Sequence, residues 1–320
     1  ADGQIRVFSL KDSSLVGNYT SPFGDAVHQI ESVGPGFLVA SDGNSLWQVT
    51  MGANLVSTWI NVATLSTNTA PATDMLVVST DVWIATDGAG LFHYSGGSIQ
   101  QYDSQNVLPS DSVVALEMVG TYLLIGLADA GVARRDLATG NWVATWNTGN
   151  WLLSDDIQDI SSADGWAHII ADNVVYSYNT TSLSFSSSWT MSDLDLSRDL
   201  GQSLIPWPIG GSRAPADHSV LVGDGSGVFT VLRPHMQNHG AQASSWPQIE
   251  LASGPSVTEM TDAVELNGIL YIATEETVQR FNIAQYRWET PHVMQINSAL
   301  VCIATDGTDL FLGTAGDGVI

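Results

Sequence analysis

The chain has 320 residues, 33 acidic and 9 basic, so its formal net charge is −24. This charge excludes the usual nucleic-acid binder, because such proteins cluster Lys and Arg to displace counterions from phosphates. It also excludes attraction to an anionic membrane surface. Charged residues are only 13% of the chain, which is too few for a charge-swollen disordered protein.

The single cysteine and the hydropathy pattern narrow the class further. Cys302 is the only cysteine, so no intrachain disulfide forms. It lies in an apolar run, residues 299–303, which is typical of a buried thiol rather than a reactive one. No run of 18 apolar residues occurs, so we expect no membrane insertion. The chain begins Ala1-Asp2-Gly3 without Met, which indicates a processed or excised product.

The predicted elements follow one repeated pattern. Residues 5–10 and 15–19 look like the third and fourth strands of a repeat. A short apolar run ending in a small residue then recurs seven times, and these small residues are Ala40, Ala85, Gly126, Ala171, Gly223, Ala273 and Gly313. Their spacings are 45, 41, 45, 52, 50 and 40 residues. An alternating segment precedes each run, and an acidic turn, a third apolar segment and an aromatic residue follow it.

Four strands at this period are typical of a propeller blade. The sequence therefore predicts an all-β, seven-bladed β-propeller with four-stranded antiparallel blades, forming one domain over residues 1–320. The N-terminal strands would complete the blade that ends at residues 310–314, which leaves no long exposed sheet edge. Residues 318–320 compete with residues 5–10 for one strand position. Either the blade boundaries are ragged, or the chain was cut from a longer protein.

Part of the repeat resembles a known family. The stretch Leu108-Pro109-Ser110-Asp111-Ser112-Val113-Val114, followed by residues 123–126, residues 131–134 and Trp142, is similar to the two-component-regulator type propeller repeat. A second copy begins at Leu153, and residues 83–91 match its strand-turn-strand part. Residues 198–260 depart from the pattern. The resemblance implies a propeller fold, an extracytoplasmic compartment and a sensory or scaffolding role.

An acidic residue follows each apolar run, and the seven are Asp42, Asp87, Asp129, Asp172, Asp224, Glu275 and Asp317. If the turns share one face, these acids ring one mouth of the central channel. Their oxygens predict a site for Ca²⁺ or a cationic ligand, since hard cations prefer carboxylate and carbonyl oxygens. The alternative interpretation is turn chemistry, because Asp-Gly and Asp-Asn favour tight turns in any propeller.

Two inserted loops predict a second binding region. Long loops on a rigid scaffold commonly carry recognition, and residues 198–247 are interrupted twice. The candidate ligand-binding residues are Trp207, Arg213, His218, Arg233, His235 and His239. His235 and His239 with His218 also allow a metal site, and ordinary loop histidines are the alternative.

These patterns favour a non-enzymatic recognition, sensory or scaffold protein that is extracellular, on the cell surface or periplasmic. A protein or glycan ligand, with Ca²⁺ as a candidate cofactor, would meet the acidic mouth or the inserted loops. One alternative is a carbohydrate-active lyase or hydrolase that uses the channel-mouth acids; another is a structural subunit of a surface assembly. No Gly-x-Ser-x-Gly elbow occurs. A single lysine among so many carboxylates predicts adaptation to a salty exterior.

Overall fold

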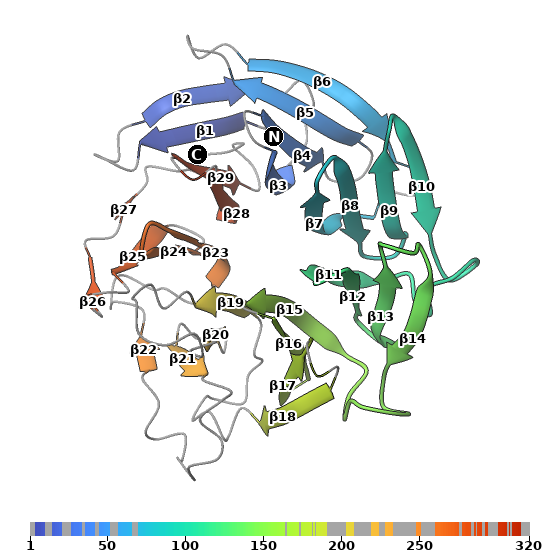
Figure 1. The fold of residues 1–320 in the computed structure, drawn as a ribbon. Helices are drawn as coiled ribbons and strands as arrows, with labels where there is room; N and C mark the ends of the chain where they lie inside the picture. Colours follow the sequence, from blue (N-terminus) through green and yellow to red (C-terminus); the bar gives the residue numbers. More distant parts are fainter. Residues whose placement is uncertain are drawn as a thin grey trace. The chain divides into compact units, whose positions relative to one another are not determined.

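The structure is a computed structural model of the whole chain (Figure 1). It describes residues 4–9, 15–20, 27–33, 36–41, 45–51, 57–65, 70–163, 165–172, 174–180, 182, 184–190, 203–207, 219–223, 228–232, 248–250, 260–274, 277–282, 285, 287–289, 292–293, 300–305, 307 and 309–314. Every regular element in these residues is a β-strand, and the strands form seven antiparallel sheets. The prediction of an all-β chain built from four-stranded antiparallel sheets is therefore confirmed. None of these residues forms a helix that could span a membrane.

The chain divides into two compact units, and the first comprises residues 1–107 and 260–320. It holds four sheets, with strand orders β2-β1-β29-β28, β3-β4-β5-β6, β10-β9-β8-β7 and β23-β24-β25-β26, and β27 also pairs with β25. Its strands are β1 (Gln4–Ser9), β2 (Leu15–Thr20), β3 (Val27–Val33), β4 (Gly36–Ser41), β5 (Ser45–Met51), β6 (Ser57–Thr64), β7 (Ala72–Val78), β8 (Asp81–Thr86), β9 (Gly90–Ser95), β10 (Ser98–Tyr102), β23 (Met260–Leu266), β24 (Ile269–Thr274), β25 (Thr277–Asn282), β26 (Arg287–Trp288), β27 (His292–Val293), β28 (Leu300–Thr305) and β29 (Asp309–Thr314).

The second unit comprises residues 108–259 and holds three sheets, β11-β12-β13-β14, β15-β16-β17-β18 and β19-β20-β21-β22. Its strands are β11 (Val113–Val119), β12 (Tyr122–Leu127), β13 (Gly131–Asp136), β14 (Trp142–Trp146), β15 (Ile157–Ala163), β16 (Trp166–Ala171), β17 (Val174–Asn179), β18 (Ser184–Thr190), β19 (Ser203–Trp207), β20 (Ser219–Gly223), β21 (Val228–Leu232) and β22 (Gln248–Glu250). Within each unit the first strands of neighbouring sheets contact one another.

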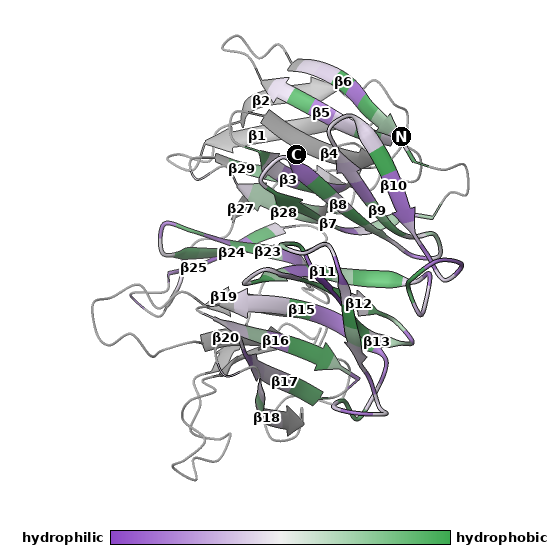
Figure 2. Ribbon diagram, turned by 45° about the vertical axis from the view of Figure 1, so that its right-hand side comes forward, coloured by the Kyte–Doolittle hydropathy of each residue, from purple (hydrophilic) through white to green (hydrophobic). Residues whose placement is uncertain are grey.

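The second strand of a sheet lies in the core. In β8, β12, β16 and β24 the first residue is partly buried and the next five are buried. A strand covered on both faces needs apolar residues on both faces, so its sequence is a continuous apolar run without alternation. Figure 2 accordingly colours much of β16 as hydrophobic, while the end of β13 is hydrophilic. The seven predicted apolar runs all lie on second strands or, at the C-terminus, on β29.

Sheet-to-sheet packing requires a small residue at Gly126, where the apolar run of β12 ends. A Cβ added to Gly126 at the end of β12 would lie 2.9 Å from Cγ2 of Ile157 on β15. It would also lie 3.3 Å from the side chains of Ala115 and Ile160. The neighbouring sheet therefore packs directly onto the backbone at this position, which only a small residue permits.

In the first unit, neighbouring sheets are joined by hydrogen bonds of one side chain, that of the third residue in the first strand of a sheet. The Gln29 side-chain amide donates to the Thr73 carbonyl at 2.7 Å. The Asp262 carboxylate accepts the Ile303 N–H at 2.9 Å, and burial raises the pKa of this carboxyl group to about 6. The Cys302 thiol accepts the Ile30 N–H. Burial, and then the charge of Asp262, raises the pKa of Cys302, so this thiol is inert, as the sequence indicated.

One sheet contains the first and the last described strands. Strand β1 pairs with β29, with Arg6 opposite Leu312 and Ser9 opposite Asp309, and β2 pairs with β1. Figure 1 shows the blue strands β1 and β2 beside the red strand β29. The outer strands of this sheet thus come from the N-terminus and its inner strands from the C-terminal part of the chain.

Candidate functional site

Three of the seven predicted acidic turn residues are described. Asp87, Asp129 and Asp172 are exposed and follow the second strands β8, β12 and β16. The remaining four, Asp42, Asp224, Glu275 and Asp317, lie outside the described residues. Within the described part of the chain, no group of three or more His, Cys, Asp and Glu side chains is arranged to hold a metal ion. The calcium site stays a prediction.

Two of these turn acids lie close to a third carboxylate in the second unit. The pKa of Asp156 is raised first by burial and then by the negative charges of Asp172 and Asp129. The Asp172 N–H donates to the Asp156 carbonyl at 2.9 Å, so the turn after β16 is tied to the start of β15. Asp172 also has a positive φ of 53°, which Asp tolerates better than most residues. Asp172 therefore fits both interpretations: it has a turn conformation, and its charge lies close to that of another carboxylate.

Of the six ligand-binding residues predicted in the inserted loops, the structure describes one. Trp207 is described only as the last residue of β19. The other predicted ligand-binding residues, Arg213, His218, Arg233, His235 and His239, lie outside the described residues. Binding by these loops therefore stays a prediction.

A Ser, an Asp and a His do converge in the first unit, but in the wrong order for catalysis. The Ser95 hydroxyl donates to Asp81 at 2.6 Å, and His93 Nε2 lies 3.1 Å from the same carboxylate. A nucleophilic triad places the His between the Ser and the Asp, whereas here the Asp lies between them. The His93 ring also stacks on Trp83, with centroids 3.8 Å apart. His93 thus has a hydrogen-bonded structural role within its sheet.

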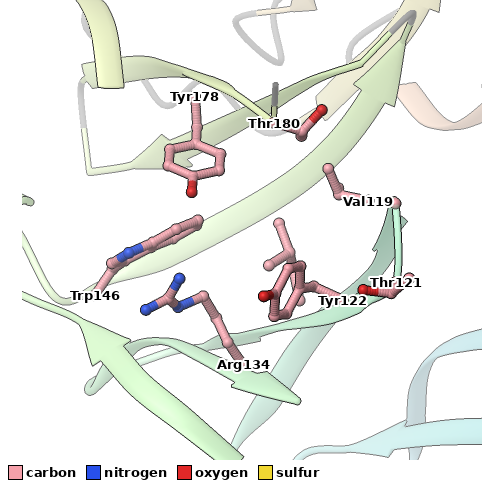
Figure 3. Close-up of a pocket in the computed structure, with 9 residues that line it drawn as sticks. Val119, Thr121, Tyr122, Arg134, Trp146, Tyr178 and Thr180 are labelled. Atoms are coloured by element: carbon pink, nitrogen blue, oxygen red, sulfur yellow. The ribbon is translucent and has the colours of Figure 1, made fainter. Parts of the chain in front are cut away.

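A cavity of about 200 Å³ lies in the second unit, between the sheet β11–β14 and the sheet β15–β18 (Figure 3). Two facing rows of residues position it. In one sheet Glu117, Leu124 and Arg134 lie opposite one another on β11, β12 and β13. In the other, Ser162, Ala167 and Tyr178 do so on β15, β16 and β17. The lining side chains include Val119, Tyr122, Arg134, Trp146, Tyr178 and Thr180.

The outer end of the first row is the guanidinium of Arg134. A β-bulge between Val132 and Arg134 shifts the register of β14. The Ala144 carbonyl in that bulge accepts hydrogen bonds from Arg134 Nε at 2.9 Å and from Nη2 at 2.6 Å. Burial lowers the pKa of Arg134, but a guanidinium stays charged in proteins. The sheet therefore holds a fixed positive charge at the wall of the cavity.

Trp146 forms an aromatic wall beside this charge. Its side chain is 3% exposed, and the Arg134 guanidinium lies 4.2 Å from its ring centroid. Tyr178 and Phe185 pack on it with centroids 4.5 and 5.0 Å away. Figure 3 shows Tyr122 across the hollow from Trp146. Gly131 allows Trp146 to come this close, because a Cβ on Gly131 would collide with the Trp146 carbonyl oxygen.

The inner end of the two rows is a buried acid. The Ser162 hydroxyl donates to Glu117 at 3.1 Å, and the Met118 N–H donates to the same carboxylate at 2.9 Å. Burial raises the pKa of Glu117 to about 7 despite these hydrogen bonds. Leu124, which is 2% exposed, lies between Glu117 and Arg134 in the row. Two strand spacings, roughly 10 Å, therefore separate the backbone at Glu117 from the backbone at Arg134.

Arg134 has counterparts in three other sheets. The residue opposite the third position of the second strand is His93 on β9, Ser177 on β17 and Arg280 on β25. His93 contacts Asp81, Ser177 bonds to His168 at 2.8 Å, and Arg280 forms an ion pair of 2.9 Å with Glu289. Each of these side chains thus has a polar partner within its own sheet. Among the described residues, no carboxylate forms an ion pair with Arg134.

The cavity residues were not predicted from the sequence. The sequence pattern places Arg134 only within the repeat stretch of residues 131–134, with no role in binding. One signal was present: when the strands are aligned, Arg134 matches the position of Arg280, but the acid that follows Arg280 nine residues later is missing after Arg134.

No family model matches the sequence, and a search of curated proteins found no match. Solved structures do share the fold. The extracellular domain of the hybrid two-component system BT4673 from B. thetaiotaomicron matches with a TM-score of 0.67 and 12% identity, over 100% of this chain and 43% of that chain. That of BT3049 from the same organism matches with a TM-score of 0.64 and 16% identity, over 93% and 40%.

A computationally designed protein, Ika8, matches with a TM-score of 0.57 and 12% identity, over 91% of this chain and 97% of that chain. The present chain spans about two fifths of the two B. thetaiotaomicron structures. At such low identities the likeness shows the fold alone, which is the propeller-like, all-β class of four-stranded antiparallel sheets.

Proposed function

We propose that this chain is a seven-bladed β-propeller that acts as a non-catalytic recognition module outside the cytoplasm, with its N-terminal strands closing the ring. The pairing of β1 with β29 supports the closure. The fold shared with extracellular domains of two-component systems supports the compartment and a sensory role. Propellers commonly carry function in sites that differ between proteins, so the site must be argued from its own residues.

The observation that carries a recognition role is the cavity between the sheets β11–β14 and β15–β18. Three aromatic side chains, two threonines and one guanidinium converge there. This combination of apolar walls with a few placed polar groups is typical of a ligand pocket. Among the described residues that line the cavity there is no histidine, cysteine, serine or carboxylate, the groups that most often act as nucleophile or general base. This lining favours binding of a ligand over its chemical conversion.

Two further ligand positions belong to the same proposal. The acidic turns that include Asp87, Asp129 and Asp172 would bind Ca²⁺ or a cationic ligand, and the raised pKa of Asp156 supports a concentration of negative charge there. The inserted loops around Trp207 would bind a protein or a glycan.

A thermal-shift panel of calcium chloride, neutral oligosaccharides and small organic acids tests the recognition role. We expect at least one class to raise the melting temperature saturably, since a ligand of the native state stabilises it in proportion to ln(1 + [L]/Kd). Nuclear magnetic resonance of the recovered ligand should show it unchanged. Turnover of any ligand, or no shift with any class, contradicts a non-catalytic recognition module.

A further inference from the structure

The size and walls of the cavity select a small ligand. A cavity of about 150 Å³ is enough for a benzene ring, and this one measures about 200 Å³. It therefore has room for one ring and a short substituent. Val119, Leu124 and the aromatic rings of Tyr122 and Trp146 provide apolar walls, so the body of the ligand is apolar.

The polar end of the cavity selects the charge of that ligand. A guanidinium has five N–H donors, and Arg134 uses one on Nε and one on Nη2 for Ala144. The remaining donors, on Nη1 and Nη2, are available at the cavity wall, where only the phenols of Tyr178 and Tyr122 alter the pKa of Arg134 by their charge. A planar guanidinium matches the geometry of a carboxylate, which accepts two parallel N–H bonds.

The position-matched residue shows what such an arginine does when the sheet supplies the anion. Arg280 on β25 bonds to Glu289, whose N–H donates to the Arg280 carbonyl, so the two residues are cross-strand neighbours. The cross-strand neighbour of Arg134 is Val143. The second unit therefore has the cation of this pair in place and an apolar side chain where the acid would be.

We propose that the cavity between β13, β14 and β17 binds a small organic anion, an apolar ring that carries one carboxylate. The carboxylate takes the place that Glu289 has beside Arg280 and bonds to Arg134. The ring lies between Tyr122, Tyr178 and Val119, and the Thr180 hydroxyl lies at the wall. This inference rests on the proposed recognition function and names the ligand class of one of its sites.

Calorimetry of the wild-type chain with phenylacetate and with phenylacetamide tests the charge requirement. The two probes have the same shape, but only phenylacetate is an anion. We expect phenylacetate to bind with a dissociation constant of about 1 mM or tighter and at least about tenfold more strongly than the amide, as is usual for hydrogen bonds to charged groups. Equal binding of the two probes, or no binding of phenylacetate, overturns the proposal.

Three single variants locate the site. Arg134→Gln should remove the preference for phenylacetate over phenylacetamide. Arg135→Gln is the matched control, because Arg135 is on the same strand, lies over Trp142 at 5.3 Å and faces the opposite side of the sheet. It should leave the preference unchanged. Val143→Glu keeps Arg134 but places an acid opposite it, and should abolish phenylacetate binding even if Arg134→Gln fails to fold.

The outcomes separate this inference from the proposed function. Unchanged phenylacetate binding in Val143→Glu, or an equal loss in Arg135→Gln, overturns the assignment to this cavity. If phenylacetate fails while calcium or an oligosaccharide raises the melting temperature, the cavity proposal is wrong and the recognition function stands. If the chain converts phenylacetate into a product, the proposal of a non-catalytic recognition module is wrong.

Discussion

Arg134 and Arg280 occupy the same position in two sheets and differ in how their charge is satisfied. Arg280 lies 5.8 Å from the ring centroid of Tyr271 and pairs with Glu289, and both side chains of the pair are about one-fifth exposed. Arg134 lies over Trp146, and among the described residues its hydrogen-bond acceptor is the backbone carbonyl of Ala144. One sheet thus completes its ion pair internally, whereas the other keeps a charge at a cavity. A single cross-strand residue, Glu289 or Val143, makes the difference.

The largest effect is expected at the glycine that brings Trp146 to Arg134. Gly131 has a φ of +80°, and an added Cβ would collide with the Trp146 carbonyl oxygen. Gly131→Ala should lower the free energy of unfolding by about 3 kcal/mol and remove any ligand binding at the cavity. Gly140→Ala is the control, since Gly140 also has a positive φ but its Cβ would meet no atom within 4 Å. If urea unfolding showed the same loss of unfolding free energy in both variants, the collision at Gly131 would be contradicted.

Breaking the internal pair should have the next largest effect. Glu289→Val gives Arg280 the apolar neighbour that Arg134 has, but without the bonds to a bulge carbonyl. The half-buried guanidinium would lose its partner, so we expect a loss of about 2 kcal/mol in unfolding free energy. The Asn282 side chain, which donates to Glu289 at 3.1 Å, contributes to that loss. A change smaller than about 0.5 kcal/mol would mean that the pair is solvated like a surface ion pair.

The buried acid of the Arg134 row makes stability depend on pH. Because the pKa of Glu117 is raised from 4.5 to about 7 in the folded chain, the folded state holds a proton that the unfolded state has lost between those values. Stability therefore falls as pH rises from about 4.5 to 7 and levels off above. Glu117→Gln cannot titrate, so its stability relative to wild type should increase across that window, by on the order of 2 kcal/mol.

Urea unfolding of both proteins at several pH values measures this difference. The comparison also removes the contribution of Asp262, whose pKa is raised to about 6 and which is present in both chains. A difference that stays constant from pH 4.5 to pH 8 would show that Glu117 ionises normally.

The smallest effect is expected from supplying the missing acid. Val143→Glu should form a pair with Arg134 and stabilise the chain by about 0.5 kcal/mol in low salt, as exposed ion pairs do. Because salt screens such pairs, the gain should shrink in high salt. A gain that is independent of salt would indicate that the Glu stem packs on the sheet without pairing to Arg134. Thermal melts at two ionic strengths distinguish the two results.

The sequence predicted the strands more readily than the cavity. The second strands were predictable because burial on both faces leaves an apolar run ending in a small residue, as at Leu124 to Gly126. The cavity depends instead on register. The hairpin register makes Val143 the neighbour of Arg134, and the bulge beyond this pair frees the Ala144 carbonyl. The first leaves one mark in the sequence, the acid that is missing nine residues after Arg134, and the bulge leaves none. The turn acids were visible for the opposite reason, because Asp is itself a turn former.

The side-chain bonds between neighbouring sheets of the first unit explain how this part of the fold can persist while its sequence changes. Gln29, Asp262 and Cys302 make these contacts with an amide, a carboxyl group and a thiol, and in each case the partner is a backbone group. Every residue has a backbone carbonyl and all but proline have an N–H, so a substitution at the joint needs no matching change on the other side. The sheets can therefore diverge independently of one another over evolutionary time, which accords with a shared fold at 12 to 16% identity.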